Sequence, residues 1–278
     1  FVAGRTQPYR ILDLTDAISS EVERSLPYRD PKWRLVYRLE LPRIRRYERD
    51  IVRHFDETWL ISNAEKQKLS ADNYNDKIQV VPNGVDSARY RPSGLPVDSP
   101  RLIFVGHMGV FHNVDAAEHL VRDILPRVRA IFPNASLDLV GAEPAPAVRH
   151  LASTPGVRVL GHVADLNAAL NDASIFVAPL RFAAGVQNKV LEAMAVGLPI
   201  VTTTYVNDGL EAEDGRHLLV ADEPDQFADA VITLLKNTQL RRSLGRAGRE
   251  FVMNHYRWED VLDRVNLIQN QIAHQQRR

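Results

Sequence analysis

Short apolar runs rich in β-branched residues alternate along this chain with longer segments whose apolar residues recur at helical spacing. Two parallel strands need a crossover connection, usually a helix, so this alternation predicts a mainly parallel, doubly wound α/β sheet. Strands are expected at residues 11–14, 57–61, 78–81, 101–105, 136–140, 157–160, 174–178, 200–202 and 217–220. Helices are expected at residues 33–54, 64–72, 114–131, 145–151, 166–170, 188–196, 224–236, 239–254 and 258–273.

A linker is expected between Asn83 and Pro100, where an Asn-Gly pair, a Ser-Gly pair and several prolines cluster and the apolar periodicity lapses. We therefore expect a first domain with its linker over residues 1–98 and a second, Rossmann-like domain over residues 99–256. Only about three strands precede the linker, too few for a complete doubly wound domain. Because the chain also begins at Phe1 without a methionine, we expect the first domain to be partial and the chain to be a fragment or a processed product.

The charge balance excludes a global electrostatic footprint, because 35 Lys and Arg residues offset 35 Asp and Glu residues. We therefore expect no nucleic-acid partner, and any anion site must be local. The chain has no cysteine, which excludes disulfides, thiolate nucleophiles and cysteine-ligated zinc and fits a reducing, cytoplasmic compartment. No apolar stretch approaches the roughly 20 residues of a membrane-spanning helix. No group of His, Asp and Glu has metal-ligand spacing, so we expect no metal and no resident cofactor.

One basic concentration stands out at residues 32–53, where eight Lys and Arg residues outnumber three acidic ones and Trp, Leu, Val and Tyr are interleaved. This pattern fits a peripheral contact with an anionic membrane surface. It also fits a solvated helix with no partner, which is the more ordinary interpretation.

The candidate ligand site is the segment that follows the apolar run ending at Ala178 and opens the helix expected from Asn188. Helical spacing places Asn188, Lys189 and Glu192 on one face and the apolar residues on the opposite face, against the sheet. Gly185 allows the backbone to approach a ligand closely, and the first N–H groups of a helix attract anions. A lysine in the first turn is unfavourable for the helix dipole, so it indicates an anionic ligand such as a diphosphate. We expect Glu192 to accept hydrogen bonds from ribose hydroxyls.

The same residues also fit an ordinary amphipathic helix in which Lys189 and Glu192 form a solvated pair at i and i+3. The position of the segment favours a ligand, because ligands of open α/β sheets bind beyond the carboxyl ends of the strands.

Several further motifs follow one another in order. They are VPNGVD at residues 81–86, FVGHM at 104–108, NVDA at 113–116, LVG at 139–141, VRVLGHV at 157–163 and YRW at 256–258. Together with QNKVLEAMA at residues 187–195 and GLPIV at 197–201, they resemble family-4, or group 1, glycosyltransferases of the GT-B fold. The subgroup that this chain resembles most is the sugar transferases associated with exopolysaccharide and exosortase-type gene systems. The similarity runs from about Asp13 to Trp258.

The resemblance implies a GT-B architecture of two Rossmann-like domains, with a C-terminal helix at residues 257–278 returning to the first domain. It implies transfer of a sugar from a nucleoside diphosphate-sugar donor to an acceptor hydroxyl, with retention at the anomeric carbon and without a metal. The acceptor would be a glycan or a lipid-linked molecule in polysaccharide or glycoconjugate synthesis. It assigns the catalytic roles to Lys189 and Glu192. The implied donor-binding residues are Gly106, His107, Arg181, Gly185, Val186, Gln187, Asn188, Lys189 and Glu192.

Two departures from the family pattern concern charge. Many members carry two glutamates in this segment; Glu192 matches the second, whereas Ala184 replaces the first. Many members also carry a basic pair after the first strand of the second domain, where this chain offers only His107 and His112. Because histidine is mostly neutral at pH 7, Lys189 and Arg181 become the expected cations. If the first domain is partial, we also expect donor binding to persist while transfer is weak or absent.

Two other functions fit the same residues. One is a non-catalytic module that binds a nucleotide sugar, and the other is a sugar-nucleotide epimerase or hydrolase, which would need acid and base residues that the sequence does not place. A dinucleotide-dependent dehydrogenase is disfavoured, because no Gly-x-Gly-x-x-Gly opens either domain.

Overall fold

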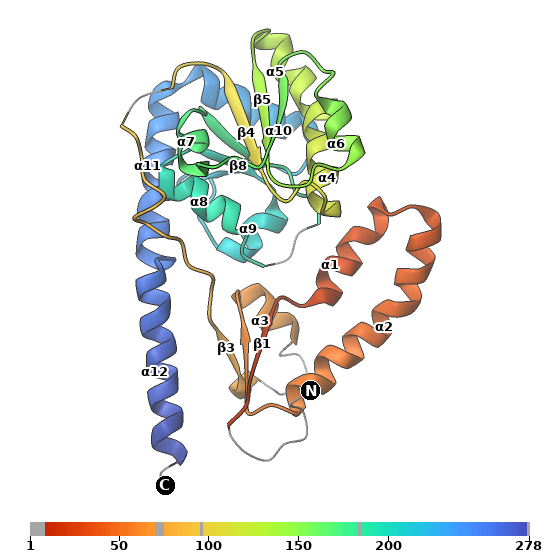
Figure 1. The fold of residues 1–278 in the computed structure, drawn as a ribbon, viewed down its shortest axis with the longest axis vertical. Helices are drawn as coiled ribbons and strands as arrows, with labels where there is room; N and C mark the ends of the chain where they lie inside the picture. Colours follow the sequence, from red (N-terminus) through yellow and green to blue (C-terminus); the bar gives the residue numbers. More distant parts are fainter. Residues whose placement is uncertain (1–8, 70–74, 95–96, 183–184, 277–278) are drawn as a thin grey trace.

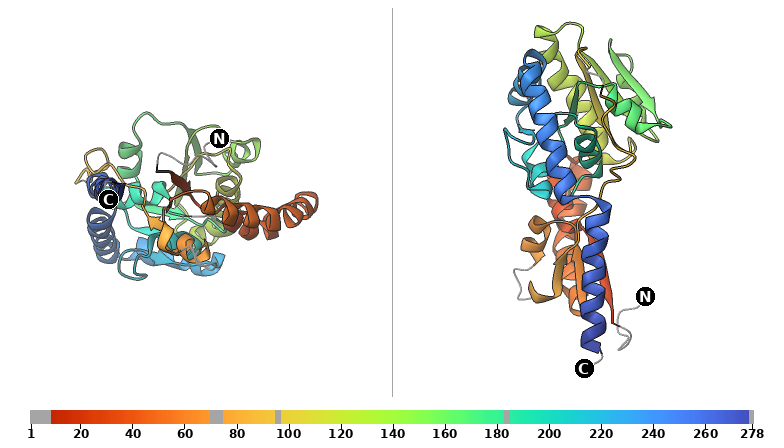
Figure 2. Two further views of the ribbon diagram at one scale, coloured as in Figure 1. Left: turned by 90° about the horizontal axis from the view of Figure 1, so that it is seen from below. Right: turned by 90° about the vertical axis from the view of Figure 1, so that its left-hand side faces the viewer.

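The structure is a computed structural model that describes residues 9–69, 75–94, 97–182 and 185–276. Its strands form two separate sheets, both parallel (Figure 1). The smaller sheet has the order β1-β2-β3, from β1 (Ile11–Thr15), β2 (Glu57–Leu60) and β3 (Ile78–Val80). The larger sheet has the order β6-β5-β4-β7-β8-β9. The molecule is elongated, with the larger sheet and its helices at one end and the smaller sheet at the other (Figure 2).

The larger sheet carries the main hydrophobic core. Its strands are β4 (Arg101–Val105), β5 (Ser136–Val140), β6 (Val157–Gly161), β7 (Ile175–Ala178), β8 (Ile200–Thr202) and β9 (Leu219–Val220). Every residue of β7 and β8 is buried, as is all of β4 except its first residue. Strands of a parallel sheet are buried on both faces because crossover helices cover them, which explains their continuous apolar sequences.

The helices around the larger sheet follow the expected order. They are α4 (Phe111–His119), a π-helical segment η4 (Leu120–Ile124), α5 (Leu125–Ile131), α6 (Pro146–Leu151), α7 (Leu166–Asn171), α8 (Asn188–Val196), α9 (Thr204–Leu210), α10 (Pro224–Lys236) and α11 (Thr238–His255). A single helix was expected over residues 114–131, but η4 interrupts it. Pro126 explains the interruption, because proline has no N–H for the regular helical hydrogen bond and its ring clashes with the carbonyl group four residues earlier.

The smaller sheet is accompanied by α1 (Ile18–Ser25), η1 (Leu26–Tyr28), α2 (Pro31–Arg53), α3 (Asn63–Leu69) and η3 (Asn75–Lys77). A small core joins Ala17, Val52, Leu60, Leu69 and Ile78. Figure 1 shows α2 extending far beyond this sheet, and of its 23 residues only Leu41, Glu48 and Val52 are buried.

The expected linker runs without a regular helix or strand through most of residues 81–100. Side-chain amides of α7 fix it, because Asn167 and Asn171 accept hydrogen bonds from the backbone N–H groups of Arg91 and Ser93 at 3.0 and 2.6 Å. The last helix, α12 (Trp258–Gln276), begins beside the linker and runs alongside the smaller sheet (Figures 1 and 2). Where α12 begins, a Cβ atom at Gly84 would lie 2.5 Å from the Trp258 ring, so this crossing requires glycine.

The predicted fold class is confirmed: the chain is α/β with parallel sheets, and each expected strand is present within two residues of its expected limits. Helices α1 and α9 were not predicted. Within the described part of the chain, no helix combines the length and the apolar character needed to cross a bilayer. The division of the chain into domains at residues 98 and 256 remains a prediction.

Candidate donor site

The candidate site is built around the amino end of α8, at the carboxyl edge of the larger sheet. We call Gly185–Gln187 the glycine turn, since it connects the segment after β7 to the helix. Gly185 has φ +60°, a left-handed conformation that glycine adopts without strain. Val186 is buried, whereas Asn188 at the first helical position is exposed. The N–H of Val190 already donates to the backbone oxygen of Gln187 at 2.9 Å, so the candidate donors to a ligand are the first two helical N–H groups, those of Asn188 and Lys189.

The apolar face of α8 anchors the helix as predicted, because Val190, Leu191 and Met194 are completely buried. Gly197 ends the helix with φ +84°, in the left-handed conformation usual after a helix C-terminus. The orientation of Lys189 and Glu192 therefore follows from packing of the opposite face.

Lys189 turns inward and is not part of a solvated pair. Its Nζ donates a hydrogen bond to Oδ1 of Asn113 and lies 5.3 Å from the centre of the Phe104 ring. Asn113 is itself buried, and its Nδ2 donates to the backbone oxygen of His107 at 3.1 Å. Burial lowers the pKa of Lys189 to about 7, although the charge of Glu192 opposes this shift. An anion bound beside Lys189 would raise this pKa again, because a nearby negative charge favours the protonated amine.

Glu192 lies one turn further along α8 and faces the linker. Burial raises its pKa, while a hydrogen bond from the Tyr90 hydroxyl and the charges of Arg89 and Lys189 lower it. Burial and the same carboxylate raise the pKa of Tyr90 to about 12, so this hydroxyl stays a donor at neutral pH. Glu192 is thus positioned by Tyr90 and retains acceptor capacity for further hydroxyl groups.

Gly106 directly follows β4, at a crossing where no side chain fits. A Cβ atom at Gly106 would lie 2.7 Å from the Asn113 side chain, and one at Gly141 would lie 1.6 Å from the Gly106 oxygen. Gly106 is therefore explained by its contact with the Asn113 side chain, and Gly141 by its contact with the Gly106 backbone. The next residue, His107, is about half exposed, and its Nε2 lies 3.6 Å from a carboxylate oxygen of Glu143.

Arg181 is already paired. Its Nε donates to Asp115 at 2.9 Å and its Nη2 donates to the second oxygen of the same carboxylate, while the guanidinium lies 4.1 Å from the centre of the Tyr28 ring. This bidentate arrangement offsets most of the charge that was expected to face donor phosphates. A donor-binding role of Arg181 remains a prediction.

Helix α1, which was not predicted, and the following η1 connect β1 of the smaller sheet to α2 and lie against the carboxyl edge of the larger sheet (Figure 1). Glu21 of α1 pairs with Nδ1 of His112 at 3.3 Å. Tyr28 of η1 stacks on Phe182 with ring centres 5.1 Å apart. His112, one of the two histidines that stand where many family members carry a basic pair, therefore has a carboxylate partner in this arrangement.

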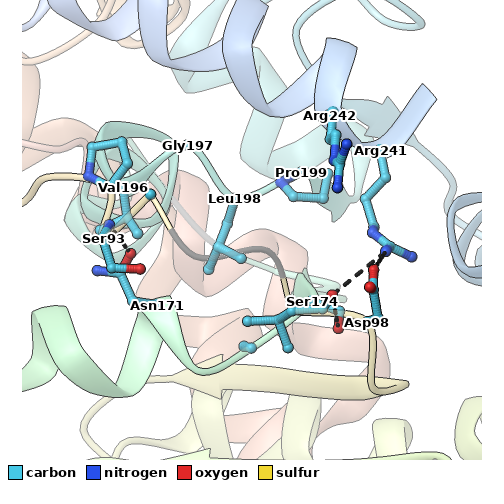
Figure 3. A pocket seen from close by; sticks show the side chains of 14 residues that line it. Ser93, Asp98, Asn171, Ser174, Val196, Gly197, Leu198, Pro199, Arg241 and Arg242 are labelled. Atoms are coloured by element: carbon cyan, nitrogen blue, oxygen red, sulfur yellow. Dashed lines mark hydrogen bonds and ion pairs between the residues drawn. The ribbon is translucent and has the colours of Figure 1, made fainter. Parts of the chain in front are cut away.

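A cavity of about 410 Å³ lies elsewhere, under the linker (Figure 3). Ser174 and Pro199 line it just before β7 and β8, so it opens at the amino ends of the strands, opposite to α8's first turn. Figure 3 shows Arg241 pointing toward Asp98, with Nη2 at 3.3 Å from Oδ1. We attribute this cavity to the passage of the linker over the domain edge.

Among the described residues, no three His, Asp or Glu side chains gather in a geometry that would hold a metal ion. Ala184, which replaces the family's first glutamate, lies outside the described residues.

Comparison with protein families identifies the class. The family model described as glycosyl transferases group 1 matches residues 99–237, which is half of the chain. The chain therefore belongs to the group 1 glycosyltransferase family, as its motifs had indicated.

Among curated relatives, the phosphatidyl-myo-inositol mannosyltransferase of Mycobacterium leprae is 29% identical over 203 residues, covering 69% of this chain and 53% of the relative. A GDP-mannose-dependent phosphatidylinositol monomannoside mannosyltransferase of Mycobacterium tuberculosis is 29% identical over 232 residues, covering 73% of this chain and 58% of the relative. The chain thus spans about half the length of the curated relatives it matches.

Solved structures show the same fold. A sucrose-phosphate synthase of Thermosynechococcus elongatus has a TM-score of 0.71 at 20% identity, covering 84% of this chain and 62% of that one. Anabaena HepE, solved with UDP and glucose, has a TM-score of 0.68 at 14% identity, covering 94% of this chain and 71% of that one. These likenesses confirm the GT-B type of the predicted fold.

Proposed function

We propose that this chain binds a nucleoside diphosphate-sugar at the amino end of α8 and serves sugar transfer with retention at the anomeric carbon. The observation that supports the proposal most is Lys189, held in the first turn of a helix against Asn113 and Phe104. Within the described residues no carboxylate forms an ion pair with this partly buried cation, which is costly, and the helix dipole adds to the cost. An anionic ligand would offset both terms.

In the proposed mechanism, the diphosphate leaves as its bond to the anomeric carbon breaks, and negative charge grows on its oxygens. The first N–H groups of α8 and the ammonium of Lys189 would stabilise that charge in fixed positions. Glu192, positioned by the Tyr90 hydroxyl, would accept hydrogen bonds from the ribose hydroxyls. These groups provide the stabilisation that a metal ion supplies in other enzymes, so we propose no metal.

Gly106, His107, Arg181, Gly185, Val186, Gln187 and Asn188 remain our proposed further donor-binding residues. The acceptor is proposed to be a glycan or a lipid-linked molecule in polysaccharide synthesis, which rests on the family resemblance. One curated relative is named for phosphatidylinositol, which is consistent with a lipid-linked acceptor. Retention can be tested by NMR of the sugar that the chain releases from an α-linked donor by slow hydrolysis. An initial β anomer would contradict it.

The donor proposal is tested by calorimetric titration of this chain with UDP, GDP, uridine and guanosine. These bases are chosen because one relative is named for GDP-mannose and one structural neighbour was solved with UDP. Lys189→Ala should weaken the diphosphate far more than the nucleoside, because the ammonium acts on phosphate as a point charge. Equal losses for both ligands would instead assign Lys189 a structural role.

We also propose a peripheral membrane contact through residues 32–53. Leu35 and Leu39 are 62% and 64% exposed on the outward face of α2. Arg43 and Arg46 continue the same face, with side chains 76% and 82% exposed. Apolar side chains flanked by cations fit the interface of an anionic bilayer.

Flotation with vesicles tests this contact. The chain should float with vesicles that contain phosphatidylglycerol and remain behind with pure phosphatidylcholine, and Leu35→Gln together with Leu39→Gln should reduce flotation. Equal flotation of the double variant, or none by the parent chain, would contradict the contact and favour the solvated-helix interpretation.

A further inference from the structure

The end of β1 is strained. Thr15 has φ +63°, which is unusual for a residue other than glycine and costly for a β-branched side chain. The register of β1 with β2 also shifts between Asp13 and Thr15. Strain of this kind persists only where the surrounding structure fixes the backbone, so the conformation of this segment is specified by its neighbours.

Two buried glutamates fix it. We call residues 15–20 the β1 elbow. The backbone N–H of Ala17 donates to Oε2 of Glu65 at 3.0 Å, and that of Ser19 donates to Oε1 of Glu48 at 2.8 Å. Glu65 and Glu48 are only 1% and 4% exposed and come from α3 and α2. Buried carboxylates bonded to backbone N–H groups hold the elbow rigidly, and with it the side chain of Asp16, which directly precedes Ala17.

The Asp16 side chain is directed at the glycine turn. A Cβ atom at Gly185 would lie only 1.7 Å from Oδ1 of Asp16, so the carboxyl packs directly on the Gly185 backbone. Within the described residues, Oδ1 of Asp16 is buried and has no hydrogen-bond partner. A buried acceptor without a donor is costly and rare in folded proteins, so an acceptor held this firmly requires an explanation.

The surroundings of Asp16 do not supply that explanation. Burial, followed by the charges of Glu65 on α3 and Glu21 on α1, raises the pKa of Asp16 to about 6, against the opposing charge of Lys68 on α3. Lys68 is itself committed to Glu65, with Nζ 2.7 Å from Oε1. The carboxyl is therefore placed at an unfavourable position, beside the turn that leads into α8, by a rigid and strained segment.

We infer that Asp16 accepts a hydrogen bond from a hydroxyl of the donor's sugar ring, from the side of the smaller sheet. This inference rests on the proposed function, because the sugar is joined to the diphosphate that we place at α8's first turn. A neutral polyol supplies the hydrogen-bond donors that Oδ1 lacks. Since Oδ1 packs on Gly185, the two surfaces must separate to admit the hydroxyl. Asp16 is thus a sugar-binding residue that distinguishes a nucleotide sugar from the bare nucleotide.

The experiment compares ligands with and without the sugar. The parent chain and Asp16→Asn are titrated by calorimetry with UDP and UDP-glucose, and with GDP and GDP-mannose. The matched control is Asp13→Asn, which changes an exposed carboxylate on the same strand. We expect Asp16→Asn to leave diphosphate affinity within about twofold while weakening the nucleotide sugar about tenfold, the effect of replacing a charged hydrogen-bond acceptor with a neutral one. Asp13→Asn should change neither affinity.

Measuring nucleotide-sugar affinity at several pH values adds a second test, because a purely structural role of Asp16 would not make this affinity depend on its protonation. The nucleotide-sugar affinity of the parent chain relative to that of Asp16→Asn should fall as the pH is lowered from 7.5 to 5, because protonation of Asp16 removes the charged acceptor, whereas protonation of Lys189 acts on both proteins alike.

Equal weakening of both ligands by Asp16→Asn, no weakening of either, or an unchanged pH dependence would overturn the assignment. If the parent chain binds neither diphosphates nor nucleotide sugars, the proposed function itself fails. The two failures are therefore distinguishable.

Discussion

Binding of a nucleotide sugar should draw a proton from solution through Lys189. In the free chain, burial against Phe104 and Asn113 lowers the pKa of this ammonium to about 7. A diphosphate beside it favours the charged form and should return the pKa to its ordinary value near 10.4 or above. A nucleotide sugar is the better probe than a free diphosphate, since its bridging phosphates do not titrate near neutral pH.

The magnitude follows from these two pKa values. At pH 8.5, a group with a pKa of about 7 is about 97% neutral, so binding should take up close to one proton. At pH 6 the same group is already about 90% charged, and uptake should fall to about 0.1 proton. Between these limits, affinity should decline by up to about tenfold for each pH unit above 7, which corresponds to about 1.4 kcal/mol.

Calorimetry in buffers of different ionisation enthalpy measures the uptake directly. Lys189→Met should abolish it, whereas Lys236→Met, which changes an exposed lysine in the last turn of α10, should leave it intact. Thermal unfolding of each variant shows whether the fold is retained. Proton uptake that is absent at pH 8.5 in the parent chain, or that persists in Lys189→Met, would refute this account. In that case Lys189 would not be a neutral amine in the free chain that becomes protonated when the diphosphate binds.

Glu192→Gln should weaken nucleoside binding by about 1.5–3 kcal/mol, the usual loss for a hydrogen bond to a charged group, and unchanged affinity in calorimetry would exclude the ribose role. Gly185→Ala should lower the melting temperature more than Gly215→Ala, because both glycines have positive φ but only Gly185 also meets the Asp16 carboxyl; equal losses would place the cost in the backbone alone. Because the pKa of Asp16 is raised from 3.8 to about 6, its contribution to stability is fully present below pH 3.8 and is lost as the pH rises through 6. Asp16→Asn should therefore stabilise the chain relative to the parent by about 2 kcal/mol at pH 7.5 and by much less at pH 4, as read from urea unfolding, and a gain that does not vary with pH would contradict the titration.

The sequence predicts the fold well because apolar periodicity reports burial directly. The fully buried strands β7 and β8 appear as continuous apolar runs, and their limits were predicted within one residue. Helix α1 was missed because ISSEVERS is short and rich in serine, which favours caps and turns over helix interiors. Helix α9 was missed for a related reason, since TYVNDGL combines weak helix formers with glycine.

The candidate site was predicted in part. The side chains that α8 presents follow from helical geometry, which is why Lys189 and Glu192 could be identified together. Their partners could not, because Asn113 and Tyr90 are 76 and 102 residues away along the chain and meet them only through the fold. For Asn113 a signal existed in its motif with Val114 and Asp115, whereas nothing local distinguished Tyr90 in the linker.

The ion pairs of the site also could not be predicted from the sequence. Arg181 was expected to face phosphate, and the structure pairs it with Asp115 on α4. Such an ion pair joins two segments 66 residues apart, and no local pattern specifies it. The same holds for Asp16, whose importance depends on its contact with Gly185.

The most direct test of the central claim is a crystal structure of this chain with a nucleotide sugar bound. We predict the diphosphate within hydrogen-bond distance of the backbone N–H groups of Asn188 and Lys189, with the Lys189 Nζ contacting a phosphate oxygen and Glu192 contacting the ribose. A diphosphate bound instead beside Arg241 and Arg242, in the cavity under the linker, would contradict the placement of the donor site at α8.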